Sequence, residues 1–251
     1  MKNYYRMAKE ASLQIEGHKG LEYLKNLCSQ ADRVLDIGCG EGTRLNTLLS
    51  RNKSGYGVDI NPYAISLAKK QYPHHKFYLS KSGSLPFGSN SFDIVYSAFV
   101  LEHTSDPEIF IKEMVRVCKI QGKIVVLCPN YGSPNRRSPI SQENPYSKFI
   151  NGTINDFMLL LSKNLVRLNW KQVNPRQEYL HQDDDTTLEP YIHSLIKFLE
   201  TEKIIIEKCS SLWEKENPSL NPRKVLTYLL GRLNIFPFKY WGPQLFIVGK
   251  K

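Results

Sequence analysis

The sequence predicts an α/β protein with a doubly wound, mostly parallel sheet of seven strands. Strand-like and helix-like segments alternate through the first half of the chain, in the order that builds parallel sheets. Three runs, VLDI, DIVY and KIVVLC, are apolar at successive positions, as in strands that helices cover on both faces. The first run leads into three glycines at every second position, Gly38, Gly40 and Gly42, which predict a binding turn between a buried strand and a helix.

The elements of the first half follow one another without a long gap. We expect strands at 33–38, 54–60, 75–80, 91–99 and 123–130, and helices at 43–51, 62–71 and 107–119. Pro62 and Pro107 stand at the starts of two of these helices, where proline is favoured, and Gly122 stands at the expected exit of the last one.

The regular pattern stops after residue 130. Residues 131–186 are rich in Pro, Asn and charged residues and predict one helix, at 157–165. So long an interruption is more often a lid or binding insertion than a bare loop. Regularity then returns with a helix at 189–202, a strand at 203–211, a helix at 222–233 and a strand at 243–251.

Composition excludes several classes of protein. The 251 residues are 41% hydrophobic and 23% charged, as in an ordinary soluble protein. Five widely spaced cysteines without a CxxC pair suggest neither a disulfide framework nor a zinc site. We expect a cytoplasmic protein, because neither a signal peptide nor an apolar run of membrane-spanning length is found.

The formal net charge is +10, and the local excess lies between Tyr131 and Gln177. This segment holds seven Lys and Arg residues against Glu143 and Asp156. The excess would suit an anionic substrate, and scattered solvated cations are the alternative interpretation.

The glycine spacing decides between two nucleotide-binding loops. Dinucleotide enzymes use G-x-G-x-x-G, whereas this chain has G-x-G-x-G, with Asp36 two residues before the first glycine. Here the chain resembles the class I S-adenosylmethionine-dependent methyltransferases, whose first motif has this spacing and acid. The strand order matches that Rossmann-like methyltransferase fold over nearly the whole chain. A tight turn in some other α/β protein remains the alternative for this segment alone.

An acid ends the second predicted strand, about 20 residues beyond the first glycine. Asp59 could accept two hydrogen bonds from a ribose diol, and Ile60 could form an apolar face for adenine. The alternative role for Asp59 is the N-cap of the helix that begins at Pro62.

A third segment, KSGSLPFGSNSFD, resembles the D-A-x-x-L-P-F and F-D motifs of the same family. Lys81 stands where the family has an aspartate at the adenine amine, so adenine contact is expected to fall to Ser82 or to the backbone near Gly83. The resemblance thus implies ten cofactor-binding residues: Asp36, Gly38, Cys39, Gly40, Gly42, Asp59, Ile60, Ser82, Gly83 and Ala98.

Glu102 and His103 resemble the E-H pair that this subgroup carries before its next helix. Relatives that hold a divalent metal extend the pair to E-x-x-E-H, but Phe99 occupies the first position here, so no metal is expected. His103 is a candidate general base, with packing or a hydrogen bond near the methionine end of the cofactor as the alternative. His181 is the second candidate. The neighbouring run of three aspartates, Asp183 to Asp185, is interpreted as a solvated acidic cap on the following helix.

The resemblance implies methyl transfer from S-adenosylmethionine to a small molecule, with O-methylation favoured. The basic segment points to a glycan, a nucleotide sugar or another anionic metabolite. The expected layout is a cofactor-binding core at 1–130, a substrate-covering insertion at 131–186, and a return to the sheet with a smaller insertion at 187–251.

Three other functions stay open. They are an RNA methyltransferase, a non-catalytic binding module for S-adenosylmethionine, and an NAD-type dinucleotide-binding protein. Nucleic acid is not favoured, because the fourth strand is followed by SAFV rather than by the N/D-P-P-Y/F motif of nucleic-acid amino-methyltransferases. The sequence predicts no oligomeric state.

Overall fold

The computed structural model describes residue 13 and residues 15–50, 52–80, 83–162, 167–176, 183–216 and 221–251. The chain divides into two units. Unit 1 comprises Met1–Val100, Ile109–Val125 and Lys250–Lys251, and unit 2 comprises Leu101–Glu108 and Val126–Gly249.

The sheet has seven strands in the order β3-β2-β1-β4-β5-β9-β8, which confirms the predicted fold class. The strands are β1 Val34–Ile37, β2 Tyr56–Asp59, β3 Lys76–Leu79, β4 Phe92–Ala98, β5 Cys118–Pro129, β8 Ile205–Ser210 and β9 Gln244–Lys250. In unit 1, β1 pairs in parallel with both β2 and β4, and β2 pairs in parallel with β3. The order of the strands along the chain reverses between β1 and β4, so ligands are expected at the carboxyl end of β1.

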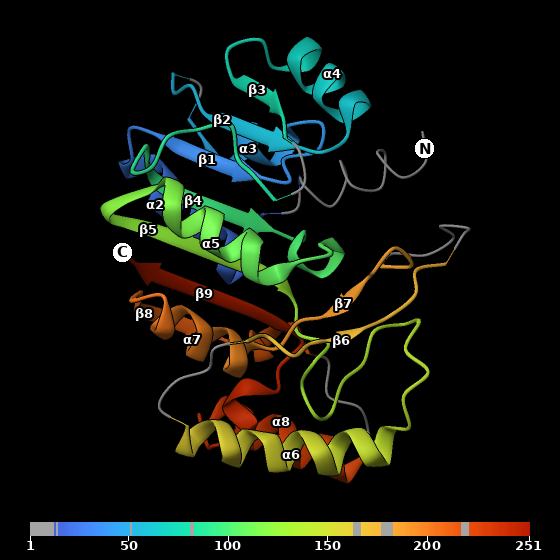
Figure 1. Ribbon diagram of the computed structural model, residues 1–251. Coiled ribbons are helices and arrows are strands. Elements are labelled where there is room, and N and C mark those ends of the chain that lie inside the picture. Colours follow the sequence, from blue (N-terminus) through green and yellow to red (C-terminus); the bar gives the residue numbers. More distant parts are fainter. Residues whose placement is uncertain are drawn as a thin grey trace. The chain divides into compact units, whose positions relative to one another are not determined.

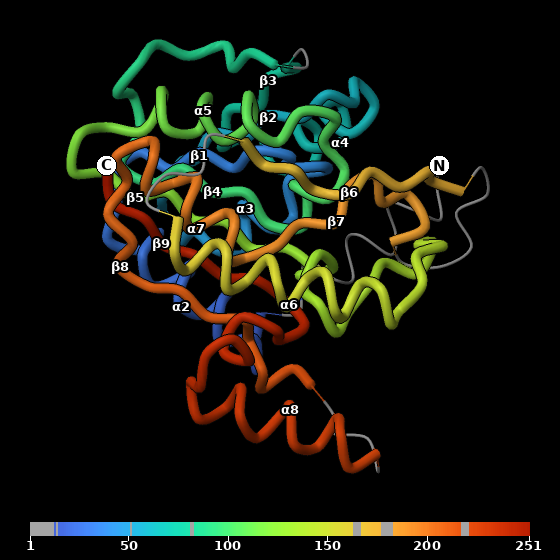
Figure 2. The backbone as a smooth tube through the Cα atoms, turned by 60° about the horizontal axis from the view of Figure 1, so that its bottom comes forward, coloured from blue at the N-terminus to red at the C-terminus, as the bar shows by residue number. Residues whose placement is uncertain are grey.

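Among the described residues, four helices cover the strands of unit 1: α2 Lys19–Gln30, α3 Thr43–Leu48, α4 Pro62–Gln71 and α5 Pro107–Val117. Within this unit, α5 lies on one face of the strands and α2 and α3 lie on the other (Figures 1 and 2). The buried faces of these helices are apolar, with Leu24, Leu45 and Ile111 fully buried. All four residues of β1 are buried, because helices cover both faces of that strand.

Unit 2 contains more helix than the sequence indicated. Its helices are α6 Pro145–Leu161, α7 Ile192–Thr201 and α8 Pro222–Arg232, with short 3₁₀ turns η1 Leu101–His103, η2 Trp213–Lys215 and η3 Phe238–Tyr240. A small antiparallel pair joins β6 Lys171–Gln172 to β7 Leu188–Glu189.

Two details of the predicted elements were wrong. Gly122 does not end a helix, because α5 stops at Val117 and Gly122 lies inside β5. The helix expected at 157–165 is the end of a longer one that begins at Pro145. The signal that was missed is Asn144-Pro145, where the Asn144 side chain accepts hydrogen bonds from the backbone N–H groups of Tyr146 and Ser147.

A buried carboxylate holds unit 2 together. Asp156 of α6 is fully buried and accepts hydrogen bonds from the Tyr191 hydroxyl and from the Trp241 indole N–H at 2.7 Å. The Nδ1 atom of His193 lies 2.8 Å from the same carboxylate. Asp156 therefore ties α6 to α7 and to the segment before β9.

Among the described residues, no helix combines the length and the apolar character needed to cross a membrane.

Replacement of Asp156 should destabilise unit 2 strongly. Asp156→Ala leaves the buried polar groups of Tyr191, His193 and Trp241 without their acceptor, at a cost of about 3 kcal/mol or more in free energy of unfolding. Urea denaturation measures the effect. The control is Glu200→Ala on α7, which removes only an exposed ion pair with Lys197 and should cost under about 1 kcal/mol. Equal stability of the two variants would contradict the proposed role of Asp156.

Candidate functional site

The three glycines of the loop after β1 all have positive φ, but they serve different purposes. A Cβ atom on Gly38 would come within 2.4 Å of Val100, and one on Gly42 would come within 2.7 Å of Phe77. At Gly40, with φ +54°, a Cβ would meet no atom within 4 Å. Gly38 and Gly42 therefore allow the loop to pack, whereas the backbone at Gly40 borders open space that a ligand can approach.

The Asp59 carboxylate joins two turns at the carboxyl ends of neighbouring strands. Its Oδ2 accepts the backbone N–H of Gly40 at 2.9 Å, and its Oδ1 accepts the backbone N–H of Asn61 at 2.8 Å. The N-cap of α4 is Asn61, whose side chain accepts the N–H groups of Tyr63 and Ala64. Asp59 is therefore not the helix cap that was the alternative for it, and it shapes the loop directly.

Asp36 is a buried acid without a hydrogen-bond partner of good geometry. It is fully buried in β1, next to Tyr96 of β4 in the parallel register. Neither of its carboxylate oxygens has a partner of good hydrogen-bond geometry among the described residues, although the Tyr96 hydroxyl lies close enough to lower the pKa of Asp36. Burial raises the pKa of Asp36 to about 7, against the opposing influence of the positive charge of Arg44. Such a group favours a cationic or hydrogen-bond-donating ligand.

Two charged residues of this loop were missed by the sequence analysis. Glu41 is buried, and one of its carboxylate oxygens has no partner among the described residues. Arg44, in the first turn of α3, donates to the backbone carbonyl of Ala98 at 2.6 Å and lies over the ring of Phe99. Three carboxylates, those of Asp36, Glu41 and Asp59, thus lie in or beside the loop. One guanidinium, that of Arg44, lies near them.

The other predicted cofactor residues of unit 1 differ in their exposure. Ile60 is 71% exposed directly after β2, as a surface for an aromatic ring requires. The Cys39 thiol is buried against Gly57, and burial raises the pKa of that thiol well above its usual range. Ala98 is fully buried at the end of β4, and Gly83 has φ +83°. Ser82 lies outside the described residues, as does Lys81.

His103 sits among acidic groups in unit 2. Its Nδ1 lies 3.1 Å from the backbone oxygen and 3.6 Å from the Oδ1 atom of Asp185, and its Nε2 lies 3.7 Å from Oε1 of Glu102. Burial lowers the pKa of His103, but the carboxylates of Glu102 and Asp185 outweigh it, so the pKa is raised overall. Burial likewise raises the pKa of Glu102 to about 7. The surroundings of His103 favour its protonated form.

The interpretation of Asp183 to Asp185 as a solvated helix cap was wrong. Asp183 accepts a hydrogen bond from the Tyr131 hydroxyl at 2.6 Å, Asp184 is buried beside Arg176, and Asp185 faces His103. The α7 helix begins later, at Ile192, with no side-chain cap. No periodic pattern marks Tyr131 or the acids as partners, because their contacts are long-range. His181 lies outside the described residues.

Ion pairs within unit 2 neutralise four of the seven Lys and Arg residues of the basic segment. Arg136 pairs with Glu216, Lys148 with Glu189, Lys171 with Glu143, and Arg176 with Asp184. The positive excess counted along the sequence is therefore largely compensated in the fold.

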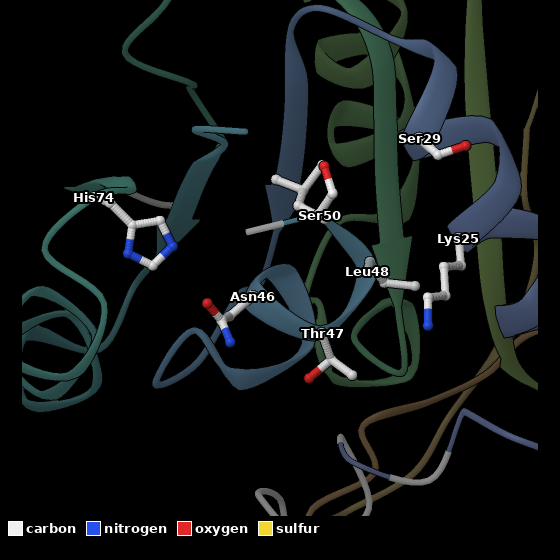
Figure 3. Close-up of a pocket in the computed structure, with 8 residues that line it drawn as sticks. Lys25, Ser29, Asn46, Thr47, Leu48, Ser50 and His74 are labelled. Atoms are coloured by element: carbon white, nitrogen blue, oxygen red, sulfur yellow. The ribbon is translucent and has the colours of Figure 1, made fainter. Parts of the chain in front are cut away.

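No group of three or more His, Cys, Asp or Glu side chains that could hold a metal ion occurs within the part of the chain that the structure describes. Figure 3 shows a pocket of about 570 Å³ in unit 1, whose lining includes Lys25, Asn46, Ser50 and His74. These residues come from α2, from α3 and from segments that precede β2 and β3. The pocket is therefore separate from the loop after β1.

The burial of Asp36 predicts how stability depends on pH. An unfolded aspartate releases its proton near pH 4, whereas folded Asp36 retains it up to about pH 7, so the folded state binds more protons in this window. The free energy of unfolding should therefore fall by about 4 kcal/mol as pH rises from about 4 to 7, and Asp36→Asn should remove this fall. Urea titrations at several pH values measure it. An identical pH dependence in both proteins would contradict the raised pKa.

The acidic surroundings of His103 predict a shift that NMR can measure. Asp185→Asn removes one of the carboxylates that raise the pKa of His103, so the imidazole should titrate at lower pH. His103→Gln assigns the resonance. Asp106→Asn, an exposed substitution three residues away in sequence, should leave the titration unchanged. No movement in Asp185→Asn would show that Asp185 does not act on His103.

Comparison with known proteins supports one family of functions. Residues 35–126 match the family model described as methyltransferase domain. A probable S-adenosylmethionine-dependent methyltransferase of Mycobacterium tuberculosis is 31% identical over 121 residues, which cover 47% of this chain and 43% of that protein. A demethylmenaquinone methyltransferase of Renibacterium salmoninarum is 33% identical over 94 residues, which cover 38% of this chain and 40% of that protein. The match thus spans less than half the length of these curated relatives.

Solved structures are similar over nearly the whole chain. An S-adenosylmethionine-dependent methyltransferase of Methanosarcina mazei has a TM-score of 0.56 at 20% identity and covers 91% of this chain and 96% of its own. The geranyl diphosphate C-methyltransferase of Streptomyces coelicolor, solved with S-adenosyl-L-homocysteine, has a TM-score of 0.55 at 13% identity, with 92% and 76% covered. Residues 35–126 are thus similar to a methyltransferase domain, and the chain has the Rossmann-like fold of solved S-adenosylmethionine-dependent methyltransferases.

Proposed function

We propose that this protein is an enzyme that transfers a methyl group from S-adenosylmethionine, which the loop after β1 binds. The observation that carries the proposal is the acidic loop with open backbone at Gly40. Asp36, Glu41 and Asp59 surround a turn whose side chains leave room for a ligand. S-adenosylmethionine carries a sulfonium and an ammonium group, so its positive charge complements these acids.

The residues of unit 1 fit the parts of this cofactor. The Asp36 carboxylate would receive the ammonium of the methionine moiety, since no donor among the described residues bonds it with good geometry. Each Asp59 oxygen accepts one backbone N–H and keeps a lone pair for a ribose hydroxyl. The exposed Ile60 side chain would cover the adenine. These roles were predicted from the sequence and remain proposals.

The same charges argue against the dinucleotide alternative. A dinucleotide loop binds a pyrophosphate, which carries negative charge and approaches the backbone at the same place. Asp36 and Glu41 would repel it, whereas Asp59 does not discriminate, because dinucleotide enzymes also place an acid at this position. We therefore favour S-adenosylmethionine over NAD.

When bound, S-adenosylmethionine supplies an activated methyl group, so the task left to the protein is to align an acceptor and to exclude water. We propose a small molecule methylated on oxygen as the acceptor, with His103 as the proton acceptor. Glu102 and Asp185 support this role because they stabilise the imidazolium that forms on protonation. His181 is retained only as a sequence-based candidate.

The chemical class of the acceptor was inferred from the positive charge of the basic segment. A glycan, a nucleotide sugar or another anionic metabolite was expected from the basic segment, and four of its seven cations now have carboxylate partners. The support that remains is Arg137 and Arg167, which are exposed and form no ion pair with the described residues. The same compensation weakens the case for an RNA substrate, which would draw on those cations.

Calorimetry with S-adenosylhomocysteine, which keeps the ammonium and ribose groups, tests the binding site. Asp36→Asn should weaken binding tenfold or more, because a charged hydrogen-bond partner is worth about 1.5–3 kcal/mol. Asp32→Asn is the matched control, an exposed substitution at the amino end of the same strand, and it should bind like the unmodified protein. Equal affinity of both variants would remove Asp36 from the site, and no binding by the unmodified protein would overturn the proposed function.

A further inference from the structure

In the α6 helix of unit 2 the charged residues are buried and most apolar residues are exposed, the opposite of the usual arrangement in a surface helix. Its two charged residues, Lys148 and Asp156, are buried and bonded to partners within the unit. Seven of its apolar side chains are more than half exposed: Tyr146, Ile150, Ile154, Phe157, Met158, Leu160 and Leu161. At 100° per residue these seven lie on the face opposite Lys148 and Leu159. The outer face of α6 therefore carries no charge.

The α8 helix has exposed leucines with positively charged residues beside them. Leu226, Leu229 and Leu233 are each at least half exposed and share one stripe of the helix, and Arg223 and Arg232 flank that stripe on either side. Residues 217–251 contain six Lys and Arg residues and no Asp or Glu. Arg223, Lys224 and Arg232 form no ion pair with the described residues. The surface of α8 thus combines exposed leucines with uncompensated positive charge.

The two helices belong to one side of unit 2. Phe157 of α6 packs against Phe236, which follows α8, with ring centroids 5.3 Å apart, and Phe149 packs against Trp241 at 5.6 Å. The η3 turn between Phe236 and Trp241 contacts α8. Figure 1 shows α6 and α8 on the same side of the unit, and Figure 2 turns that side towards the viewer.

We propose that α6 and α8 dock unit 2 on the surface of an anionic lipid bilayer. Apolar side chains on one face, with cations at the border and no acids, are typical of helices that lie in the plane of a membrane interface. Each Lys or Arg close to an anionic surface adds attraction. A second copy of this chain is the less favoured occupant, because an isologous contact would bring the α8 cations of both copies together. The inference is independent of the proposed methyl transfer.

Vesicle sedimentation of the full chain tests the proposal. The protein should sediment with vesicles of equal parts phosphatidylcholine and phosphatidylglycerol, and much less with phosphatidylcholine alone. The triple variant Arg223→Gln, Lys224→Gln, Arg232→Gln should bind the anionic vesicles at least tenfold more weakly, since about 1 kcal/mol is lost per cation. The matched control replaces three exposed lysines of unit 1, Lys25, Lys69 and Lys70, with Gln and should bind normally.

A second variant separates the apolar contribution. Ile154→Gln, Met158→Gln, Leu161→Gln replaces three side chains that are more than half exposed, so its circular dichroism should be unchanged while vesicle binding falls. Failure of the unmodified protein to sediment with anionic vesicles would overturn the proposal. So would a dimer, seen by sedimentation equilibrium without lipid, that this α6 variant abolishes. Affinity for S-adenosylhomocysteine, measured in parallel, should be the same in every variant.

Discussion

The carboxylate of Asp59 is the constraint on which the site in unit 1 depends. It accepts a backbone N–H from the loop after β1 and another from the turn after β2, so it sets the relation between these two turns. With Asp59 as an anchor, Gly40 can present its open side and Ile60 can project beside it. The parallel pairing of β1 and β2 brings the two turns to one edge of the sheet. Sheet topology and one hydrogen-bonded acid therefore build the loop together.

Each unit contains a buried aspartate, and the two differ in their hydrogen bonds. In unit 1, Asp36 is fully buried and has no partner of good hydrogen-bond geometry among the described residues, which costs stability as the pH rises and leaves a group ready for a cationic ligand. In unit 2, Asp156 is buried with its donors satisfied, so it strengthens the fold instead. His103 lies between these extremes, because it is partly exposed and faces acids that favour its protonated form. The state of the hydrogen bonds, more than burial itself, separates a binding group from a structural one.

Patterns in the local sequence predicted the strands and the glycine loop, because neighbouring residues determine both. Continuous apolar runs gave the buried strands, and the spacing of Gly38, Gly40 and Gly42 gave the loop. The role of Arg44, the buried state of Glu41 and the hydrogen bond between Tyr131 and Asp183 depend on contacts between residues far apart in sequence or on local packing that no periodicity records. The basic segment was misleading for the same reason, since its cations meet acids from other parts of unit 2. The reversed faces of α6 were also hidden, because a charged residue in a helix is normally expected to face solvent.

The central claim is that acids around the loop after β1 select a cationic nucleoside cofactor. Calorimetric titration of the unmodified protein with S-adenosylmethionine and with NAD, at the same pH and ionic strength, tests it most directly. The account predicts that S-adenosylmethionine binds and that NAD binds at least a hundredfold more weakly, a difference of about 2.7 kcal/mol. Tighter binding of NAD would contradict it, because a pyrophosphate would then be tolerated beside Asp36 and Glu41.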